Sequence, residues 1–88
     1  MGTNLKVSVI AKDKIVYNGE AVAVLAPTQS GIIEVLPGHI QLVSALKAGE
    51  LEIKIKEGED SKYFKISGGV LEVRSGSNVI ALVDIVGD

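Results

Sequence analysis

The sequence has no cysteine or tryptophan, and among its 88 residues there is a single histidine and a single phenylalanine. Without cysteine there can be no disulfide framework, thiolate metal site or thiol nucleophile. One histidine supplies too few ligands for a histidine-rich zinc site. Aromatic residues make up only 3% of the chain, so a core must be built from Val, Ile, Leu and Ala. We expect no metal, no cofactor and a reducing compartment.

Basic runs and long apolar runs are also absent. Nine Lys and Arg against eleven Asp and Glu give a net charge of −2, so we expect no nucleic-acid partner. The longest stretch without charge, residues 21–33, is broken by Pro27 and Gly31. A spanning helix needs about 20 apolar residues, so we expect no membrane insertion. The first residues show no secretory leader, and Lys6 breaks the myristoylation motif that Met1-Gly2 would open.

Apolar and polar residues alternate with a period of two over much of the chain, which is typical of strands with one buried face. Leu5, Val7 and Val9 would share one face. Residues 51–56 and 62–66 alternate on either side of a polar turn, as in a hairpin. Residues 21–26 are apolar on consecutive positions, which predicts a strand covered on both faces. A single globular domain over residues 1–88 is expected.

Turn signals recur every 8–12 residues, with Gly49, Gly58, Gly76 and the pair Gly68-Gly69 among them. This spacing predicts an all-β fold, a small antiparallel β-sandwich of about ten short strands. Gly68-Gly69 is interpreted as a bend or bulge between two strands. Residues 39–48 are interpreted as strand or turn, although their spacing of apolar residues also fits a short helical turn.

No residue pattern predicts catalysis. His39 could be a general base, but no nucleophile elbow accompanies it, and we interpret it as a packing or subunit-contact residue. The glycines form no phosphate-binding loop, so no nucleotide or other small-molecule substrate is expected. The carboxylates are dispersed over turns and strand faces, where solvation is their default role. A non-enzymatic chain is therefore expected.

Residues 31–39 are unusual because an apolar segment leads into a rigid turn. Pro37 fixes φ and Gly38 permits a positive φ, so the turn would hold His39 in place without a helix. The segment is either an ordinary core strand or a docking edge that presents apolar side chains to a partner. Both interpretations stay open on this pattern alone.

The sequence resembles the epsilon subunit family of F-type ATP synthases, over its N-terminal β-sandwich domain. The resemblance runs in order through nearly the whole chain, and its most recognisable part is the tetrapeptide Leu36-Pro37-Gly38-His39. The other matching segments are Leu5–Ile10, Asn18–Ala21, Ala26-Pro27 with Gly31, Leu42–Lys47 with Gly49–Leu51, and Tyr63-Phe64 with Ser67–Val73.

The resemblance implies a non-catalytic rotor subunit that links the gamma subunit to the membrane c-ring and couples ion translocation to ATP synthesis. It implies a position on the cytoplasmic face of a bacterial inner membrane. Two groups of contact residues are implied. Those for the gamma subunit are Pro37, Gly38, His39 and Leu42. Those for the c-ring are Gly31, Ile32, Ile33 and Glu34.

Two features depart from the family pattern. Relatives usually carry an acidic residue at the position of Ile32 and a glycine at that of Glu34. Either Glu34 replaces the missing carboxylate from the opposite strand face, or Ile32 makes an apolar contact instead. The chain also stops at Asp88, before the two C-terminal helices of many relatives, so neither autoinhibition nor nucleotide sensing is expected.

A different class of protein remains as an alternative. Lipoyl and biotinyl carrier domains are also all-β and of similar size, and they are modified on a lysine at a turn. Asp13-Lys14 could supply such a lysine. Against this, Val16 and Tyr17 follow where small residues are expected, and no Met flanks Lys14.

Overall fold

The computed structural model describes residues 4–38 and 41–86. All regular structure in these two ranges is β-strand, so no helix there could cross a membrane. The all-β prediction is confirmed. The strands are β1 (Leu5–Ala11), β2 (Lys14–Ala21), β3 (Ala23–Thr28), β4 (Gly31–Val35), β5 (Leu42–Lys54), β6 (Lys62–Arg74) and β7 (Asn78–Ile85).

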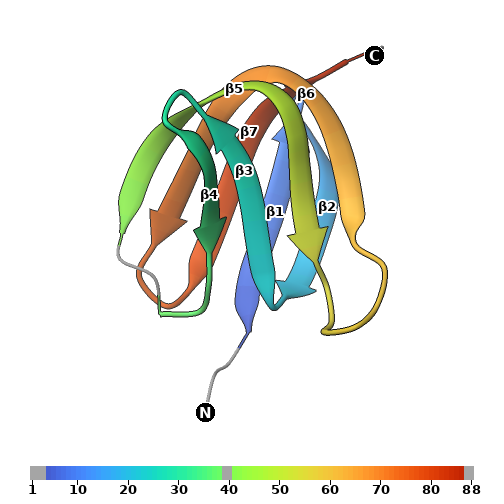
Figure 1. Ribbon diagram of the computed structural model, residues 1–88, viewed down its shortest axis with the longest axis vertical. Helices are drawn as coiled ribbons and strands as arrows, with labels where there is room; N and C mark the ends of the chain where they lie inside the picture. The colour runs from blue at the N-terminus through green and yellow to red at the C-terminus, as the bar shows by residue number, and fades with distance from the viewer. Residues whose placement is uncertain (1–3, 39–40, 87–88) are drawn as a thin grey trace.

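The seven strands form one mixed sheet in the order β2-β1-β7-β6-β5-β3-β4 (Figure 1). Five of the six pairings are antiparallel, and β1 pairs with β7 in parallel. The described residues thus form seven strands where about ten were predicted, and the predicted antiparallel character holds for all pairings but that of β1 with β7. The parallel pair places the first strand beside the last. The hairpins β1–β2 and β3–β4 form the two ends of the sheet, and β7, β6 and β5 lie between them.

The count of strands was too high because glycines do not end β5 or β6. Each strand has 13 residues, and the pairing of β5 with β6 keeps its register on both sides of Gly49. Gly49 lies against Pro27 of β3, where an added Cβ would come within 3.0 Å of the proline Cβ. The register between β6 and β7 shifts between Ile66 and Gly68, so the predicted irregularity adjoins the pair Gly68-Gly69, but it lies inside one strand and not between two.

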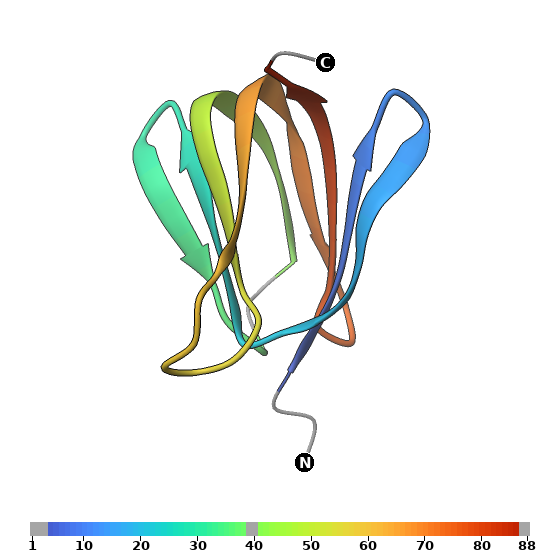
Figure 2. The same cartoon turned by 90° about the vertical axis from the view of Figure 1, so that its right-hand side faces the viewer.

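The two long strands bend strongly, and this curls the sheet (Figure 2). The end formed by β3 and β4 thereby comes to face the end formed by β1 and β2. The core cluster draws on every strand, and its fully buried members include Leu5, Val9, Leu51, Ile53 and Leu71. The predicted alternation of β1 and of the second half of β5 is confirmed by this burial.

Two further segments can be compared with prediction. The prediction of one strand over residues 21–26 is wrong in its bounds, because Ala21 ends β2, Val22 forms a bend and β3 begins at Ala23. Within β3, Ala23, Val24 and Ala26 are buried and Leu25 is half-buried, so the predicted cover on both faces holds for that part. The ambiguous segment 39–48 is strand from Leu42 onward and contains no helical turn in its described part.

Candidate interaction surfaces

The predicted c-ring contact lies on β4, an edge strand that pairs only with β3. Ile32 is 71% exposed and Glu34 is exposed, whereas Ile33 packs against the core and Val35 is fully buried. Positions 32 and 34 therefore share the outward face, as the period of a strand requires. The expectation that Glu34 lies on the opposite face from position 32 is wrong.

The turn before β4 is held by the side chain of Thr28. Its hydroxyl donates a 2.6 Å hydrogen bond to the carbonyl oxygen of Gly31 and accepts one from the Ser30 N–H at 3.2 Å. Gly31 has a φ of 115°, in the region that favours glycine. These constraints fix the approach to Ile32, so its exposed side chain projects from an ordered strand.

The predicted gamma contact begins at the turn that follows β4. Gly38 has a φ of 82°, as predicted, and its N–H donates a 3.0 Å hydrogen bond to Oγ of Ser77 in the β6–β7 turn. Leu42 is half-buried and packs on the core, and Pro37 is also half-buried. His39 lies outside the described residues. The turn is therefore tied to a second turn, and only part of Leu42 is accessible.

The two predicted contact sets lie at opposite ends of one strand. Ile32 and Pro37 are five residues apart, which corresponds to roughly 17 Å along an extended chain. A single small patch cannot contain both. The arrangement allows two partners to be contacted at once, one at each end of β4.

A larger apolar surface was not predicted. We call it the outer apolar row, and it consists of Ala45, Val70, Leu82, Ile10 and Ile15. These residues are successive register partners across β5, β6, β7, β1 and β2. The residues on either side of Ile10 and Leu82 are buried in the core, so Ile10 and Leu82 face outward. Val70, Ala45 and Ile15 lie on the same face because they are register partners in this row.

The row is substantially open to solvent. Leu82 is 49% exposed, Val70 is 40% exposed and Ile15 is 62% exposed. The sequence did carry a signal for it, because residues 79–83 are apolar at both alternating positions. Such a run indicates a strand covered on both faces. Only the register, however, shows that apolar residues of four other strands lie beside Leu82.

Charged residues border the row. Glu72 of β6 lies between Val43 and Ile80 in the neighbouring row of partners. Its carboxylate forms a 3.0 Å ion pair with Nε of Arg74. The side-chain hydrogen bond to Glu72 and the charge of that carboxylate raise the pKa of Arg74, so the guanidinium stays protonated at neutral pH.

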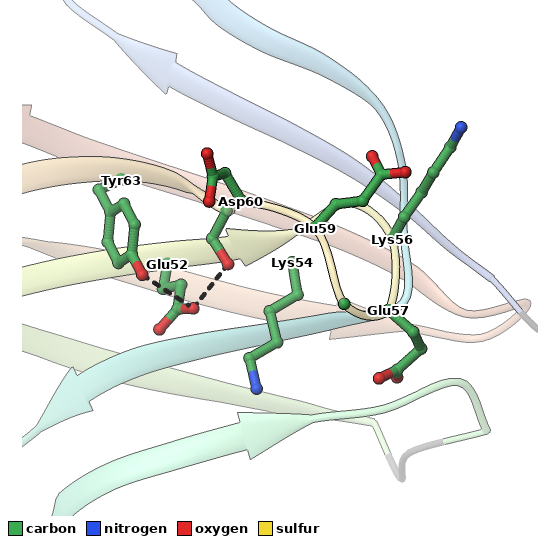
Figure 3. A pocket seen from close by; sticks show the side chains of 9 residues that line it. Glu52, Lys54, Lys56, Glu57, Glu59, Asp60 and Tyr63 are labelled. Carbon is green, nitrogen blue, oxygen red and sulfur yellow. Dashed lines mark hydrogen bonds between the residues drawn. The ribbon is translucent and has the colours of Figure 1, made fainter.

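A cleft of about 530 Å³ lies at the loop between β5 and β6 and is lined mainly by charged residues (Figure 3). Glu52 accepts hydrogen bonds from the Ser61 hydroxyl at 2.7 Å and the Tyr63 hydroxyl at 3.4 Å. The charged ends of Lys54, Lys56 and the loop carboxylates fan outward and do not converge on one point. The described residues contain no group of three acidic or histidine side chains that could hold a metal ion.

The lysine of the alternative interpretation lies at a hairpin. Lys12 and Asp13 form a two-residue turn in which both have positive φ, and Lys14 is exposed at the first position of β2. This geometry is that of an ordinary type I′ hairpin. It leaves Lys14 accessible.

Comparisons with known proteins agree with one another. The family model described as "ATP synthase, Delta/Epsilon chain, beta-sandwich domain" matches residues 4–86. An ATP synthase epsilon chain of Leptospira interrogans is 41% identical over 73 residues, covering 83% of this chain and 56% of the relative. One of Dichelobacter nodosus is 32% identical over 80 residues, covering 91% and 55%. The chain thus spans about half the length of these relatives.

Solved structures show the same fold. A chain in the Euglena gracilis mitochondrial ATP synthase, described as OSCP/F1/c-ring, has a TM-score of 0.85 and 25% identity, covering 94% of this chain and 52% of that one. A chain in the central stalk and c-ring of the Tetrahymena thermophila enzyme has a TM-score of 0.74 and 18% identity, covering 91% and 63%. The second likeness is one of fold alone.

Proposed function

Because the chain belongs to the family of ATP synthase delta/epsilon-chain β-sandwich domains, we propose that it is a non-catalytic central-stalk subunit of an F-type ATP synthase. It would link the gamma subunit to the c-ring and so help couple proton or other ion translocation to ATP synthesis. The observation that carries this proposal is the family match over residues 4–86, nearly the whole chain. The same match favours this function over a carrier domain modified at Lys14.

The proposal includes the finer expectations that go with the family. The curled sheet would act as a two-layer β-sandwich forming one domain, with no cofactor and no small-molecule substrate. It would sit as a peripheral protein on the cytoplasmic face of a bacterial inner membrane. Hydrogen bonds between strands connect all seven elements in one sheet, which suits a stiff block that transmits torque.

At the c-ring, the proposed contact is made by the outward side chains of β4. Ile32 supplies an exposed apolar group, and Glu34 supplies a carboxylate on the same face, about 7 Å further along the strand. Gly31 shapes the turn before them, and Ile33 anchors the strand to the core. The carboxylate that relatives carry at position 32 would thus be replaced by one on the same face at position 34.

The turn on the other side of β4 is the proposed start of the gamma contact. Pro37 and Gly38 form a turn that is anchored to Ser77, and His39 and Leu42 follow it in the chain. A turn held in this way loses little conformational entropy on binding, which favours its use in a permanent joint.

Replacing Ile32 by Lys tests the proposal at the ring. Ile32 is mostly exposed, so we expect the free energy of unfolding to change by no more than about 0.5 kcal/mol. A charge placed in a contact against apolar groups should weaken binding to detergent-solubilised c-ring with gamma by roughly 10–100-fold, measured by titration. Ile55→Lys is the control. Ile55 directly follows the last residue of β5 and lies outside the proposed c-ring contact, so this variant should bind normally. Undiminished binding of Ile32→Lys, or its unfolding in calorimetry, would show that the assignment is wrong.

A further inference from the structure

Ser77 has a backbone conformation that serine rarely adopts. It is the last of the three residues that connect β6 to β7 between the paired Arg74 and Asn78, and its φ is 59°. The last residue of a three-residue hairpin connection commonly lies in this left-handed region, where glycine is the usual choice because it has no Cβ. The turn alone would therefore favour glycine at this position, so the reason for a serine must lie outside the turn.

The hydroxyl group is what a glycine would lack. Oγ of Ser77 accepts a 3.0 Å hydrogen bond from the N–H of Gly38, which is distant in the sequence. Residues 36–38 lie between β4 and β5, outside the strand pairings. Among the hydrogen bonds between described residues, this one alone ties the turn at 36–38 to another segment, and Pro37 has no N–H to donate. The hydroxyl of Ser77 thus holds a turn that the sheet itself does not hold.

The backbone that carries this hydroxyl is itself fixed. The carbonyl oxygen of Ser77 accepts a 2.9 Å hydrogen bond from the N–H of Lys6 in β1. Within the turn, Nδ2 of Asn78 donates a 2.9 Å hydrogen bond to the carbonyl oxygen of Ser75. The start of β1, the β6–β7 turn and the turn after β4 all lie at the lower end of the molecule in Figure 1. Three segments distant in the sequence therefore meet at Ser77, and its hydroxyl is presented from an ordered backbone.

The turn that this hydroxyl holds is the one placed in the proposed gamma contact. Leu36 is 47% exposed and Gly38 is exposed, so the turn is open both to water and to a partner. Water competes there for the N–H of Gly38, and the hydrogen bond to Ser77 decides what fraction of molecules holds the turn in one conformation. The apparent affinity for a partner falls in proportion to that fraction. Loss of this one bond should therefore weaken gamma binding, although no strand is altered.

We propose that Ser77 is a positioning residue for the gamma subunit, whose hydroxyl holds the Pro37-Gly38 turn in the conformation that gamma binds. This inference rests on the proposed function. It assigns two separate roles to one residue. The backbone conformation of Ser77 governs the stability of the β6–β7 turn, whereas its hydroxyl governs the turn before β5. Substitutions of Ser77 should accordingly change the affinity for gamma and the Tm independently of each other.

The test compares Ser77→Gly and Ser77→Ala in a titration with the purified gamma subunit of the same organism. Both variants lack the hydroxyl, so both should bind gamma roughly 3–10-fold more weakly than the unaltered chain, which is the range expected for one hydrogen bond. Their thermal stabilities should differ, because glycine relieves the left-handed conformation and alanine does not. Ser77→Gly should therefore have the higher Tm of the two, by at least about 2 °C, and yet bind gamma no better.

Ser75→Ala is the matched control, because it removes the other hydroxyl of the same turn. Ser75 contributes its carbonyl oxygen to the turn, and the substitution leaves that group in place, so this variant should bind gamma normally. Hydrogen exchange of the Gly38 amide, followed by NMR in the free chain, reports the hydrogen bond to Ser77 directly. Exchange should be faster by roughly 3–10-fold in both Ser77 variants and unchanged in Ser75→Ala.

The outcomes separate the failure of this inference from that of the proposed function. If the unaltered chain forms no complex with gamma at tens of micromolar, the proposed function is wrong and the inference falls with it. If the complex forms but both Ser77 variants bind as tightly as the unaltered chain, only the inference is overturned. The same holds if affinity follows Tm, with Ser77→Gly binding normally and Ser77→Ala weakly, because the role of the serine would then be structural. Weaker binding without faster exchange at Gly38 would also overturn it, since the hydroxyl would then act on gamma directly.

Discussion

At the scale of single residues, two adjacent glycines of β6 have different reasons for lacking a side chain. A Cβ added at Gly69 would collide with the carbonyl oxygen of Leu82 and lie 2.9 Å from Cα of Val83. A Cβ added at Gly68 would meet only the carbonyl oxygen of Leu46, at an ordinary 3.7 Å. Gly69 is thus required by the close approach of β7, and Gly68 is not.

Gly69→Ala should therefore destabilise the protein by about 1–3 kcal/mol, because β6 and β7 must separate to admit the methyl group. For a domain of this size each kcal/mol corresponds to roughly 4–8 °C in Tm. Gly68→Ala is the control and should change the stability by less than about 0.5 kcal/mol. Urea denaturation of the three proteins measures both effects. Equal stability of the two variants would contradict the close approach.

At the scale of elements, the sequence predicted which face of a strand is buried better than it predicted where the strands begin and end. Alternation in residues 5–9 and 51–54 correctly assigned the buried positions, because burial on one face is a local property of a strand. The strand count failed at Gly49, where glycine suggested a turn. The glycine instead accommodates Pro27 of a neighbouring strand, which is a contact between residues distant in sequence. No local pattern contains that information.

The interaction surfaces could likewise be predicted only in part from local sequence patterns. The positive φ of Gly38 agrees with the expectation drawn from the Pro37-Gly38 pair. The exposure of Ile32 is consistent with a docking edge, one of the two interpretations that the pattern of residues 31–39 left open. The outer apolar row was missed because its members lie on five strands, and only the parallel pairing of β1 with β7 places Ile10 beside Leu82. Period-two reasoning assigns a face to each strand but does not assign its neighbours.

Protection of backbone amides should follow the order of the strands. β6 is the central strand, with hydrogen-bonded neighbours on both sides, whereas β2 and β4 are the edges of the sheet. Hydrogen exchange should be slowest in β6 and in the adjoining parts of β5 and β7, and fastest at the edges, where opening disrupts fewer contacts. Exchange followed by NMR measures this directly. Slower exchange in β4 than in β6 would be inconsistent with the strand order.

At the scale of the whole molecule, cooperativity depends on one pairing. β1 pairs with β7, so the N-terminal hairpin closes onto the last strand, and the core cluster includes residues from both ends of the chain. β3 and β4 join the sheet through β5 alone. The buried side chains of both ends belong to one core cluster. The sheet should therefore unfold as one unit.

Calorimetry of the unaltered chain should accordingly show a single transition. Its enthalpy should be about 60 kcal/mol near 60 °C, and the calorimetric and van't Hoff enthalpies should agree. Val9→Ala in β1 and Val24→Ala in β3 remove fully buried groups from the two opposite ends of the sheet, and both should lower the Tm of that same transition. Two resolved transitions, each sensitive to only one of these changes, would mean that the ends fold independently. The proposed role as a stiff coupling block requires that the two ends unfold together, because torque applied at one face reaches the other only through elements that stay folded together.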